Sequence, residues 1–177
     1  LFEQRVNSQL CYMDLADGTP RMVVGRRNAL YPTPSEDAVA WVEYNPDGRY
    51  TVVVQGKEGA EKRFATPDRS EIHGLAWDDA TRGYYVIVTD DSGMWLGRIE
   101  PDGTATHLTE GAYITLSDLT ARDGRLYFGS IASGYDEVHC YDLATGRQYR
   151  LSTSTYGSFS PSADGEGNVL MTTYDAE

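Results

Sequence analysis

Apolar residues in this chain gather in short runs, and most runs end at a turn that contains Gly, Asp or Asn. Near-continuous apolar stretches occur at 38–42, 51–54 and 84–88. A strand that is covered on both faces has this pattern, whereas a strand with one exposed face alternates apolar and polar residues. The segment nearest to helical periodicity, 57–63, is short and contains Gly59. The pattern therefore predicts an all-β chain.

The predicted strands recur along the sequence. A unit of about 40 residues occurs four times, and a repeat of this length built only of strands is typical of a β-propeller blade. Its clearest echo is Asp-Leu-Ala-Asp-Gly at 14–18 against Asp-Leu-Ala-Thr-Gly at 142–146. With strands labelled A to D from innermost to outermost, the A strands are predicted at 29–35, 72–78, 113–119 and 156–162, the B strands at 38–44, 84–90, 125–131 and 168–174, the C strands at 9–15, 49–55, 94–100 and 137–143, and the D strands at 20–25, 61–67, 104–110 and 147–153.

We therefore expect a β-propeller of four blade-equivalents, each with four antiparallel strands. The chain would form one domain or partial propeller over 1–177, with repeats near 1–25 plus 156–177, 26–68, 69–110 and 111–155. It begins with strands C and D and ends with strands A and B. The last two strands could complete the first two, the chain could be a slice of a larger propeller, or a second copy could close the ring. The sequence leaves these three alternatives open.

Outer strands of such blades need protection, because an unpaired strand edge can pair with another chain. The predicted D strands carry basic residues that serve this purpose: Arg21, Lys62, Arg63, Arg147 and Arg150. The chain opens on Leu1 and stops at Glu177 within a strand-like run, so we expect it to be a piece of a longer protein. The two cysteines, Cys11 and Cys140, are expected to be small buried side chains that do not pair with each other.

The amino-acid composition limits the classes of binding partner, but it says little about catalytic chemistry. The chain has 177 residues, of which 40% are hydrophobic, and a formal net charge of −12. Nucleic acid is a poor partner for this charge, because binding to phosphates needs a basic surface. No apolar run is long enough for a membrane-spanning helix, so membrane insertion is not expected. A neutral polar or cationic partner, either a protein or a small polar ligand such as a glycan, suits this charge better.

The repeats resemble the WD40-like (PD40-type) repeats of the TolB C-terminal propeller. The residues that carry the resemblance are the turn after strand A, at 34–37, 117–124 and 160–165, the end of strand C, at 14–18 and 142–146, and the end of strand D, at 108–109 and 151–152. Some features depart from this pattern. The Asn-Pro-Asp-Gly turn at 45–48 falls between B and C, the Gly-His dipeptide of WD40 blades is reversed at 73–74, and Trp77-Asp78 lies on strand A. The resemblance implies a propeller that binds partner proteins, without catalysis, in the periplasm, outside the cell or at its surface.

Candidate catalytic and metal-binding groups are few. The Gly- and Ser-rich segment 129–134 is not a Gly-x-Ser-x-Gly elbow, and we interpret it as a loop. The three histidines, His73, His107 and His139, fall in three different blades, so they are not expected to converge. The acidic pairs at 78–79 and 90–91 lack the spacing of a calcium loop, and we interpret them as solvated turns. The segment 89–95 has a likeness to an Asp box, which we interpret as coincidence. No catalytic residue, metal or cofactor is expected.

Aromatic residues provide the best candidate binding site. Trp41 and Trp95 lie inside predicted strands and are expected to be core residues. Tyr31, His73, Tyr113 and Tyr156 lie at or near the starts of the four A strands, and Trp77 lies near the end of one; together they are predicted to line a channel mouth, with ordinary blade packing as the alternative. We therefore expect a non-catalytic interaction scaffold. The alternative is an accessory propeller of a larger secreted hydrolase, a peptidase or a glycan-processing enzyme, whose catalytic residues lie outside this chain.

Overall fold

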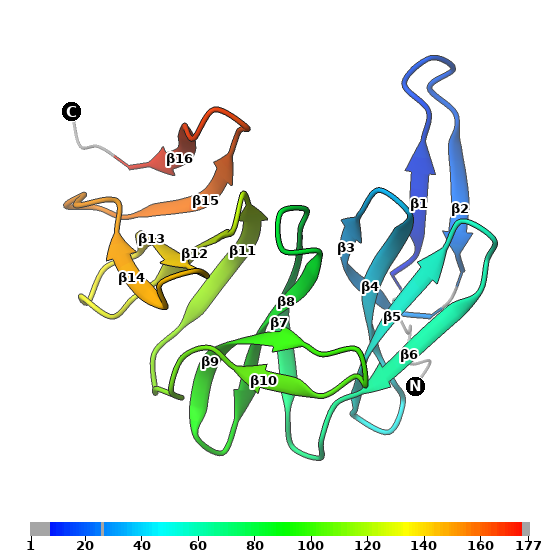
Figure 1. Cartoon of the computed structure of the whole chain (residues 1–177), viewed down its shortest axis with the longest axis horizontal. Helices are drawn as coiled ribbons and strands as arrows, with labels where there is room; N and C mark the ends of the chain where they lie inside the picture. Colours follow the sequence, from blue (N-terminus) through cyan, green and yellow to red (C-terminus); the bar gives the residue numbers. More distant parts are fainter. Residues whose placement is uncertain (1–7, 26, 175–177) are drawn as a thin grey trace, which may run out of the picture. The chain divides into compact units, whose positions relative to one another are not determined.

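The computed structural model describes residues 8–25 and 27–174, and in these ranges the chain is built of strands and turns (Figure 1). It divides into an N-terminal unit, Leu1–Asp68, and a C-terminal unit, Arg69–Glu177. The predicted repeat bounds at 1–7 and 175–177 lie outside the described residues. Within them there is no helix that is long and apolar enough to cross a membrane.

The N-terminal unit contains a hairpin and a four-stranded antiparallel sheet. The hairpin pairs β1 with β2, and the sheet has the order β3-β4-β5-β6. Their bounds are β1 (Leu10–Met13), β2 (Pro20–Val24), β3 (Ala29–Pro34), β4 (Ala38–Tyr44), β5 (Tyr50–Gly56) and β6 (Glu61–Ala65). The hairpin packs on the sheet through Leu10, which meets the fully buried Trp41 and Val53.

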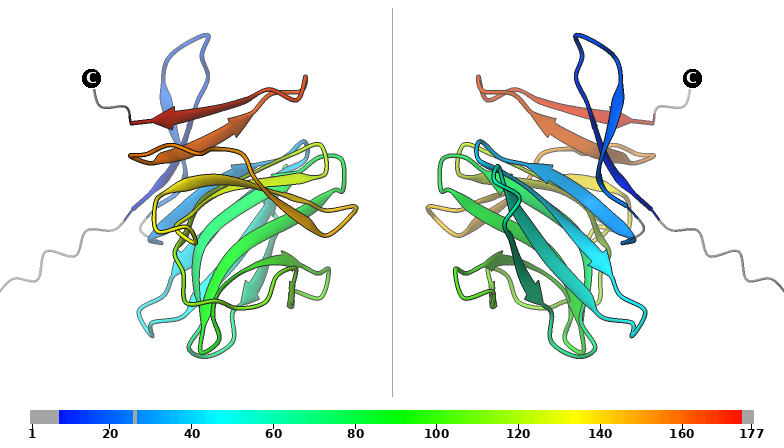
Figure 2. Two further views of the ribbon diagram at one scale, coloured as in Figure 1. Left: turned by 90° about the vertical axis from the view of Figure 1, so that its left-hand side faces the viewer. Right: turned by 90° about the vertical axis from the view of Figure 1, so that its right-hand side faces the viewer.

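The C-terminal unit contains two four-stranded antiparallel sheets and a final hairpin. The first sheet has the order β10-β9-β8-β7, the second β11-β12-β13-β14, and the hairpin pairs β15 with β16. Their bounds are β7 (Glu71–Asp78), β8 (Gly83–Asp90), β9 (Gly93–Ile99), β10 (Ala105–His107), β11 (Leu116–Arg122), β12 (Arg125–Ser130), β13 (Glu137–Asp142), β14 (Arg147–Arg150), β15 (Ser158–Ala163) and β16 (Val169–Thr173). The hairpin lies beside the second sheet, where β15 meets β11, β12 and β13 (Figure 2).

These sheets have the predicted blade structure. Each four-stranded sheet follows chain order from its first to its fourth strand, and the chain begins with a C-D hairpin and ends with an A-B hairpin, as expected. The repeated Asp-Leu turns are also equivalent. Gly18 N donates to Asp14 O and Gly146 N donates to Asp142 O, both at 2.8 Å, and both glycines have a left-handed φ near +65°.

The core of the C-terminal unit forms where the two sheets face each other. Tyr85, Ile87 and Leu96 of the first sheet pack against Leu126 and Phe128 of the second. A polar contact joins the same sheets, because the Tyr141 hydroxyl donates to the Leu108 carbonyl at 3.0 Å. Neither sheet could bury these side chains alone.

A buried carboxylate provides a second link between the two sheets. Asp78 is fully buried at the end of β7, and its Oδ1 accepts a hydrogen bond from Gly124 N at 3.0 Å, across the sheet boundary. Its Oδ2 accepts from Thr81 N at 2.9 Å and from Thr81 Oγ1 at 2.8 Å. The interpretation of this residue as part of a solvated turn is therefore wrong: Asp78 joins two blades.

Several predicted boundaries also differ. The strand expected at 113–119 is β11, Leu116–Arg122, because the preceding residue Ala112 still pairs with Met94 at the edge of β9, through hydrogen bonds of 2.8 and 3.0 Å. The fourth strands β10 and β14 are shorter than predicted. Cys140 is buried as expected, whereas Cys11 is exposed on β1, because only Leu10 of that strand packs on the neighbouring sheet.

The role of Asp78 can be tested by substitution. Asp78→Ala would leave the partly buried N–H groups of Gly124 and Thr81 without their acceptor, and we expect it to lower the free energy of unfolding by about 3 kcal/mol. The measurement is urea denaturation followed by circular dichroism. Asp79→Ala is the control, since Asp79 is exposed and, among the described residues, accepts only from Trp77 Nε1. Equal losses in the two variants would contradict a link between blades at Asp78.

Candidate functional site

Each first strand of a blade contains a β-bulge near its middle. The ladder shifts between Leu30 and Thr33 in β3, Ile72 and Gly74 in β7, Ser117 and Thr120 in β11, and Phe159 and Ser162 in β15. A residue with left-handed φ begins three of the bulges: Tyr31 at +51°, Asp118 at +52° and Ser160 at +53°. His73 is the extra residue in the fourth bulge. Non-glycine residues adopt this conformation at a cost, so the bulge is a specified feature of the repeat.

Two neighbouring bulges are in direct contact. In the C-terminal unit, Asp118 Oδ2 accepts a hydrogen bond from Ser160 N at 3.0 Å. The left-handed residue thus exposes its backbone N–H to the adjacent first strand, and a carboxylate one blade earlier occupies it. The bulges therefore help to join consecutive blades.

The structure places the predicted site residues in different surroundings. Tyr31 is the left-handed residue in β3 of the N-terminal unit, where burial raises the pKa of its phenol. His73 Nε2 lies 3.6 Å from Glu71 Oε2 on the same strand. Trp77 packs on Tyr84 with ring centroids 4.6 Å apart.

Tyr113 and Tyr156 lie before their strands instead of on them. Tyr113 is almost fully exposed, and its hydroxyl donates to the Asp91 carbonyl at 3.0 Å. In β11 and β15, the residues equivalent to Tyr31 are Asp118 and Ser160, which the alignment of the repeats within this chain did not identify. The shared signal was weak: a Pro follows the left-handed residue in β3 and β15, but Leu119 follows Asp118 in β11.

One predicted residue, Tyr156, lies in a pocket of about 390 Å³ in the C-terminal unit. The pocket is formed by the segment that connects β14 to β15, the start of β15, and β16 with the residue after it. Its lining is rich in hydroxyl groups: Leu151, Ser152, Thr153, Ser154, Thr155, Tyr156, Ser158, Met171, Thr173 and Tyr174.

Hydrogen bonds fix the inner wall of this pocket. Ser152 Oγ accepts from Val138 N at 2.9 Å, which holds the start of the connecting segment on β13. Ser154 Oγ accepts from Gly157 N at 2.9 Å and from Ser158 Oγ at 3.1 Å. The fully buried Ser158 hydroxyl also lies 3.1 Å from Thr173 Oγ1, so the connecting segment is tied to β16.

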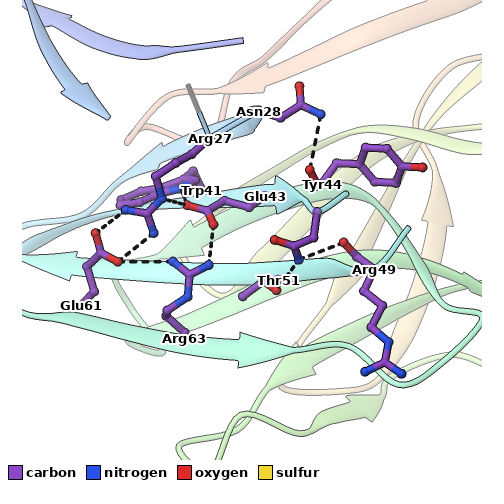
Figure 3. Close-up of polar contacts among 10 residues, drawn as sticks. Arg27, Asn28, Trp41, Glu43, Tyr44, Arg49, Thr51, Glu61 and Arg63 are labelled. Carbon is purple, nitrogen blue, oxygen red and sulfur yellow. Dashed lines mark hydrogen bonds and ion pairs between the residues drawn. The ribbon is translucent and has the colours of Figure 1, made fainter. Parts of the chain in front are cut away.

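A cluster of charged groups in the N-terminal unit is a second candidate (Figure 3). The Glu43 side chain is only 4% exposed; it accepts from Trp41 Nε1 at 2.9 Å and pairs with Arg27 Nε at 2.6 Å and with Arg63. Glu61 pairs with both arginines. The hydrogen bond from Arg27 holds the pKa of Glu61 below its usual value, and the same bond raises the pKa of Arg27.

The two positive and two negative charges of this cluster balance. Because each guanidinium already has carboxylate partners, the cluster offers no net charge to a ligand, and we interpret it as structural. Arg63, expected only to protect an edge, also joins β6 to β4 through Glu43.

The tryptophans expected in the core are there, since Trp41 and Trp95 are both buried. The segment compared to an Asp box forms a defined turn: Asp90 Oδ1 accepts from Ser92 N at 2.7 Å, and Asp90 Oδ2 accepts from Trp95 Nε1 at 2.9 Å. The bond from the Ser92 hydroxyl is the main reason that the Asp90 pKa is lowered. The segment that resembles an Asp box is thus a turn whose hydrogen bonds hold the Trp95 side chain in place.

The histidines lie on separate strands. His73 is on β7, His107 is on β10 and stacks on Trp95 with centroids 3.6 Å apart, and His139 is on β13. In the part of the chain that the structure describes, no three His, Cys, Asp or Glu side chains are grouped as metal ligands.

His139 is the most unusual of them. It is buried beside Phe128, its Nδ1 lies 2.9 Å from Gln148 Nε2, and its Nε2 has no hydrogen-bond partner among the described residues. Burial lowers the pKa of the ring; the nearby Glu137 opposes this effect and Arg150 adds to it.

This burial predicts a pH dependence of stability. Because the folded pKa lies below the unfolded value of about 6.5, the unfolded chain takes up the proton first as the pH falls. We expect the free energy of unfolding to decrease below about pH 6.5, by at most about 1.4 kcal/mol per pH unit from this group. The slope of the free energy of unfolding against pH is measured by urea denaturation of the wild type, His139→Gln and His139→Phe. The pH range is about 5.5 to about 7.5, roughly one unit on either side of the unfolded pKa. Both variants should have a smaller slope, and an unchanged slope in either one would contradict the assignment.

No family model and no curated protein matches the chain, but solved structures do. A TolB-type structure from Agrobacterium tumefaciens has a TM-score of 0.77 and 20% identity, covering 98% of this chain and 65% of that one. TolB from Acinetobacter baumannii has a TM-score of 0.75 and 14% identity, covering 94% of this chain and 43% of that one. The third structure is the β-propeller domain of the trilobed protease from Pyrococcus furiosus, described as having an open velcro topology. It has a TM-score of 0.54 and 12% identity, covering 99% of this chain and 76% of that one.

The chain thus spans less than two thirds of either TolB structure. At these identities the likeness concerns architecture. It agrees with the antiparallel, blade-like sheets described above. The chain has the fold of TolB-like β-propellers.

Proposed function

We propose that this chain is a non-catalytic binding module of propeller blades, and that its ligand docks in the pocket beside Tyr156. The observation that carries the proposal is the pocket itself: about 390 Å³, lined mainly by hydroxyl-bearing side chains and including a residue selected from the sequence as a binding residue. Its volume is in the range of about 300–1,000 Å³ that is usual for small-molecule sites.

The rigidity of the inner wall supports this role. Ser152, Ser154 and Ser158 are held by hydrogen bonds to backbone or to one another, so little ordering is needed when a ligand arrives. Tyr156 and Tyr174 are 57% and 63% exposed at the pocket, and exposed tyrosines supply large contact areas with a polar tip.

Charge and resemblance complete the proposal. The net charge of −12 favours a neutral or cationic ligand or protein partner over nucleic acid. The resemblance to TolB supports a periplasmic, secreted or cell-surface location. Joining of two copies to complete a ring stays a prediction, which light scattering on the purified chain would test.

A second candidate role is that of an accessory propeller in a larger secreted hydrolase. The likeness to the propeller domain of the Pyrococcus furiosus protease favours it. The two roles differ in what adjoins this segment in the full coding sequence: an α/β-hydrolase region next to it would favour the accessory role.

Binding without catalysis can be tested directly on the purified chain. A library of peptides and oligosaccharides is screened by thermal shift, and each compound that raises the Tm is afterwards analysed by mass spectrometry. We expect at least one compound to raise the Tm in a saturable way and to be recovered uncleaved. Because Tyr156 borders the pocket, Tyr156→Ala should reduce the affinity of the chain for that compound about five- to tenfold.

The matched control is Tyr135→Ala, because Tyr135 is 57% exposed like Tyr156, lies in the same unit, and does not line the pocket. It should leave the affinity unchanged. Recovery of a cleaved compound would overturn the absence of catalysis, and shifts that do not depend on Tyr156 would overturn the binding site.

A further inference from the structure

We infer that the pocket beside Tyr156 takes a neutral carbohydrate, a short glycan, in preference to a peptide or an anionic ligand. The inference rests on the proposed function, because it names the ligand class of the same pocket. Three properties of the lining lead to it: its lack of charge, its free hydroxyl groups, and its exposed aromatic rings.

The lining carries no formal charge at neutral pH. None of the described residues that line the pocket is Asp, Glu, Lys, Arg or His. The Asp136 carbonyl accepts from Ser158 N at 2.7 Å, but the Asp136 side chain is not part of the lining. A charged ligand would lose hydration here without gaining an opposite charge, so the pocket selects against ions.

The hydroxyl groups fall into two sets, one engaged in hydrogen bonds and one free. The engaged set comprises Ser152, Ser154, Ser158 and Thr173, which take part in the hydrogen bonds described above. The free set comprises the hydroxyls of Thr153, Thr155, Tyr156 and Tyr174, and none of these donates to or accepts from another residue that the structure describes.

A free hydroxyl can donate and accept at once, and so can each hydroxyl of a sugar. A wall of such groups therefore matches a polyol in many hydrogen-bonding arrangements. A peptide is a poorer match, because its N–H groups only donate and its carbonyls only accept, in a fixed alternation.

Tyr156 and Tyr174 supply the apolar part of the match. One face of a pyranose ring consists of C–H groups, which pack on aromatic rings. Tyr174 is held in place by Phe159, with ring centroids 5.2 Å apart, and by its own N–H, which donates to Gly157 O at 3.1 Å. Leu151 and Met171 extend the apolar surface within the pocket. Free hydroxyls beside exposed rings are the combination that a sugar requires.

The test is titration calorimetry of the 177-residue chain with defined probes. The neutral probes are maltotriose, cellotriose and N,N′,N″-triacetylchitotriose. The anionic probe is trigalacturonic acid, and the peptide probe is a Gly-Ser-Gly-Ser peptide. We expect saturable binding of at least one neutral trisaccharide, and at least fivefold weaker or no binding of the other two probes. Tyr156→Ala and Tyr174→Ala should each weaken binding about five- to tenfold, and Tyr156→Phe, which keeps the ring, about threefold or less.

Tyr135→Ala is again the control, and melting curves of all variants establish that each one is folded. If the acid or the peptide binds in a Tyr156-dependent way while the neutral sugars do not, the inference of a neutral carbohydrate is wrong and the proposed binding function stands. If neither these probes nor the wider library binds in a Tyr156-dependent way, both are wrong. Equal loss of sugar binding in Tyr135→Ala would also overturn the assignment to this pocket.

Discussion

The structure depends on one constraint: a small sheet that is apolar on both faces must be covered by its neighbours. In the C-terminal unit, Leu126 and Phe128 of one sheet are buried against Tyr85, Ile87 and Leu96 of the next. Full burial of each such side chain stabilises the fold by roughly 1.5–3 kcal/mol, and that gain exists only while both sheets are in place. Blades built in this way fold and unfold cooperatively with the blades they touch, so the unit of stability is a pair of sheets.

Polar contacts between the sheets follow from the same constraint. A buried carboxylate such as Asp78 is tolerated because its two oxygens accept three hydrogen bonds, one of them from Gly124 of the next blade. The bulges work similarly, since Asp118 satisfies the backbone N–H of Ser160. These bonds are directional, so they fix the register of one sheet on the next, which apolar packing alone leaves loose. His139 and Arg98 each retain a buried nitrogen without a partner among the described residues, and at these points the packing is polar but incompletely satisfied.

The sequence predicted the middle strands best, for a physical reason. Strand β4 was expected at 38–44 and is observed at Ala38–Tyr44, because a strand covered on both faces has a near-continuous apolar run and its ends are marked by turns. The first and fourth strands were placed less well. The start of β11 depends on the pairing of Ala112 with Met94, a contact between chain segments that leaves no pattern in composition. The left-handed residues of the bulges were missed because they are a Tyr, an Asp and a Ser, none of which signals that conformation as Gly does.

The candidate site was only partly predictable, and the constraint explains why. Sheet faces are occupied by packing and strand edges by pairing, so side chains free to meet a ligand lie at strand ends and in the connecting segments. The pocket is assembled in this way: Thr153 and Thr155 come from the connection between β14 and β15, and Tyr174 from the residue after β16. Tyr156 could be selected from the sequence because aromatic residues occur near the starts of the predicted first strands. The hydroxyl groups around it could not, since Ser and Thr in a connection carry no period and meet only when the last hairpin packs on the preceding sheet. In this fold the repeat fixes where a site can form, while the residues between repeats decide what it can bind.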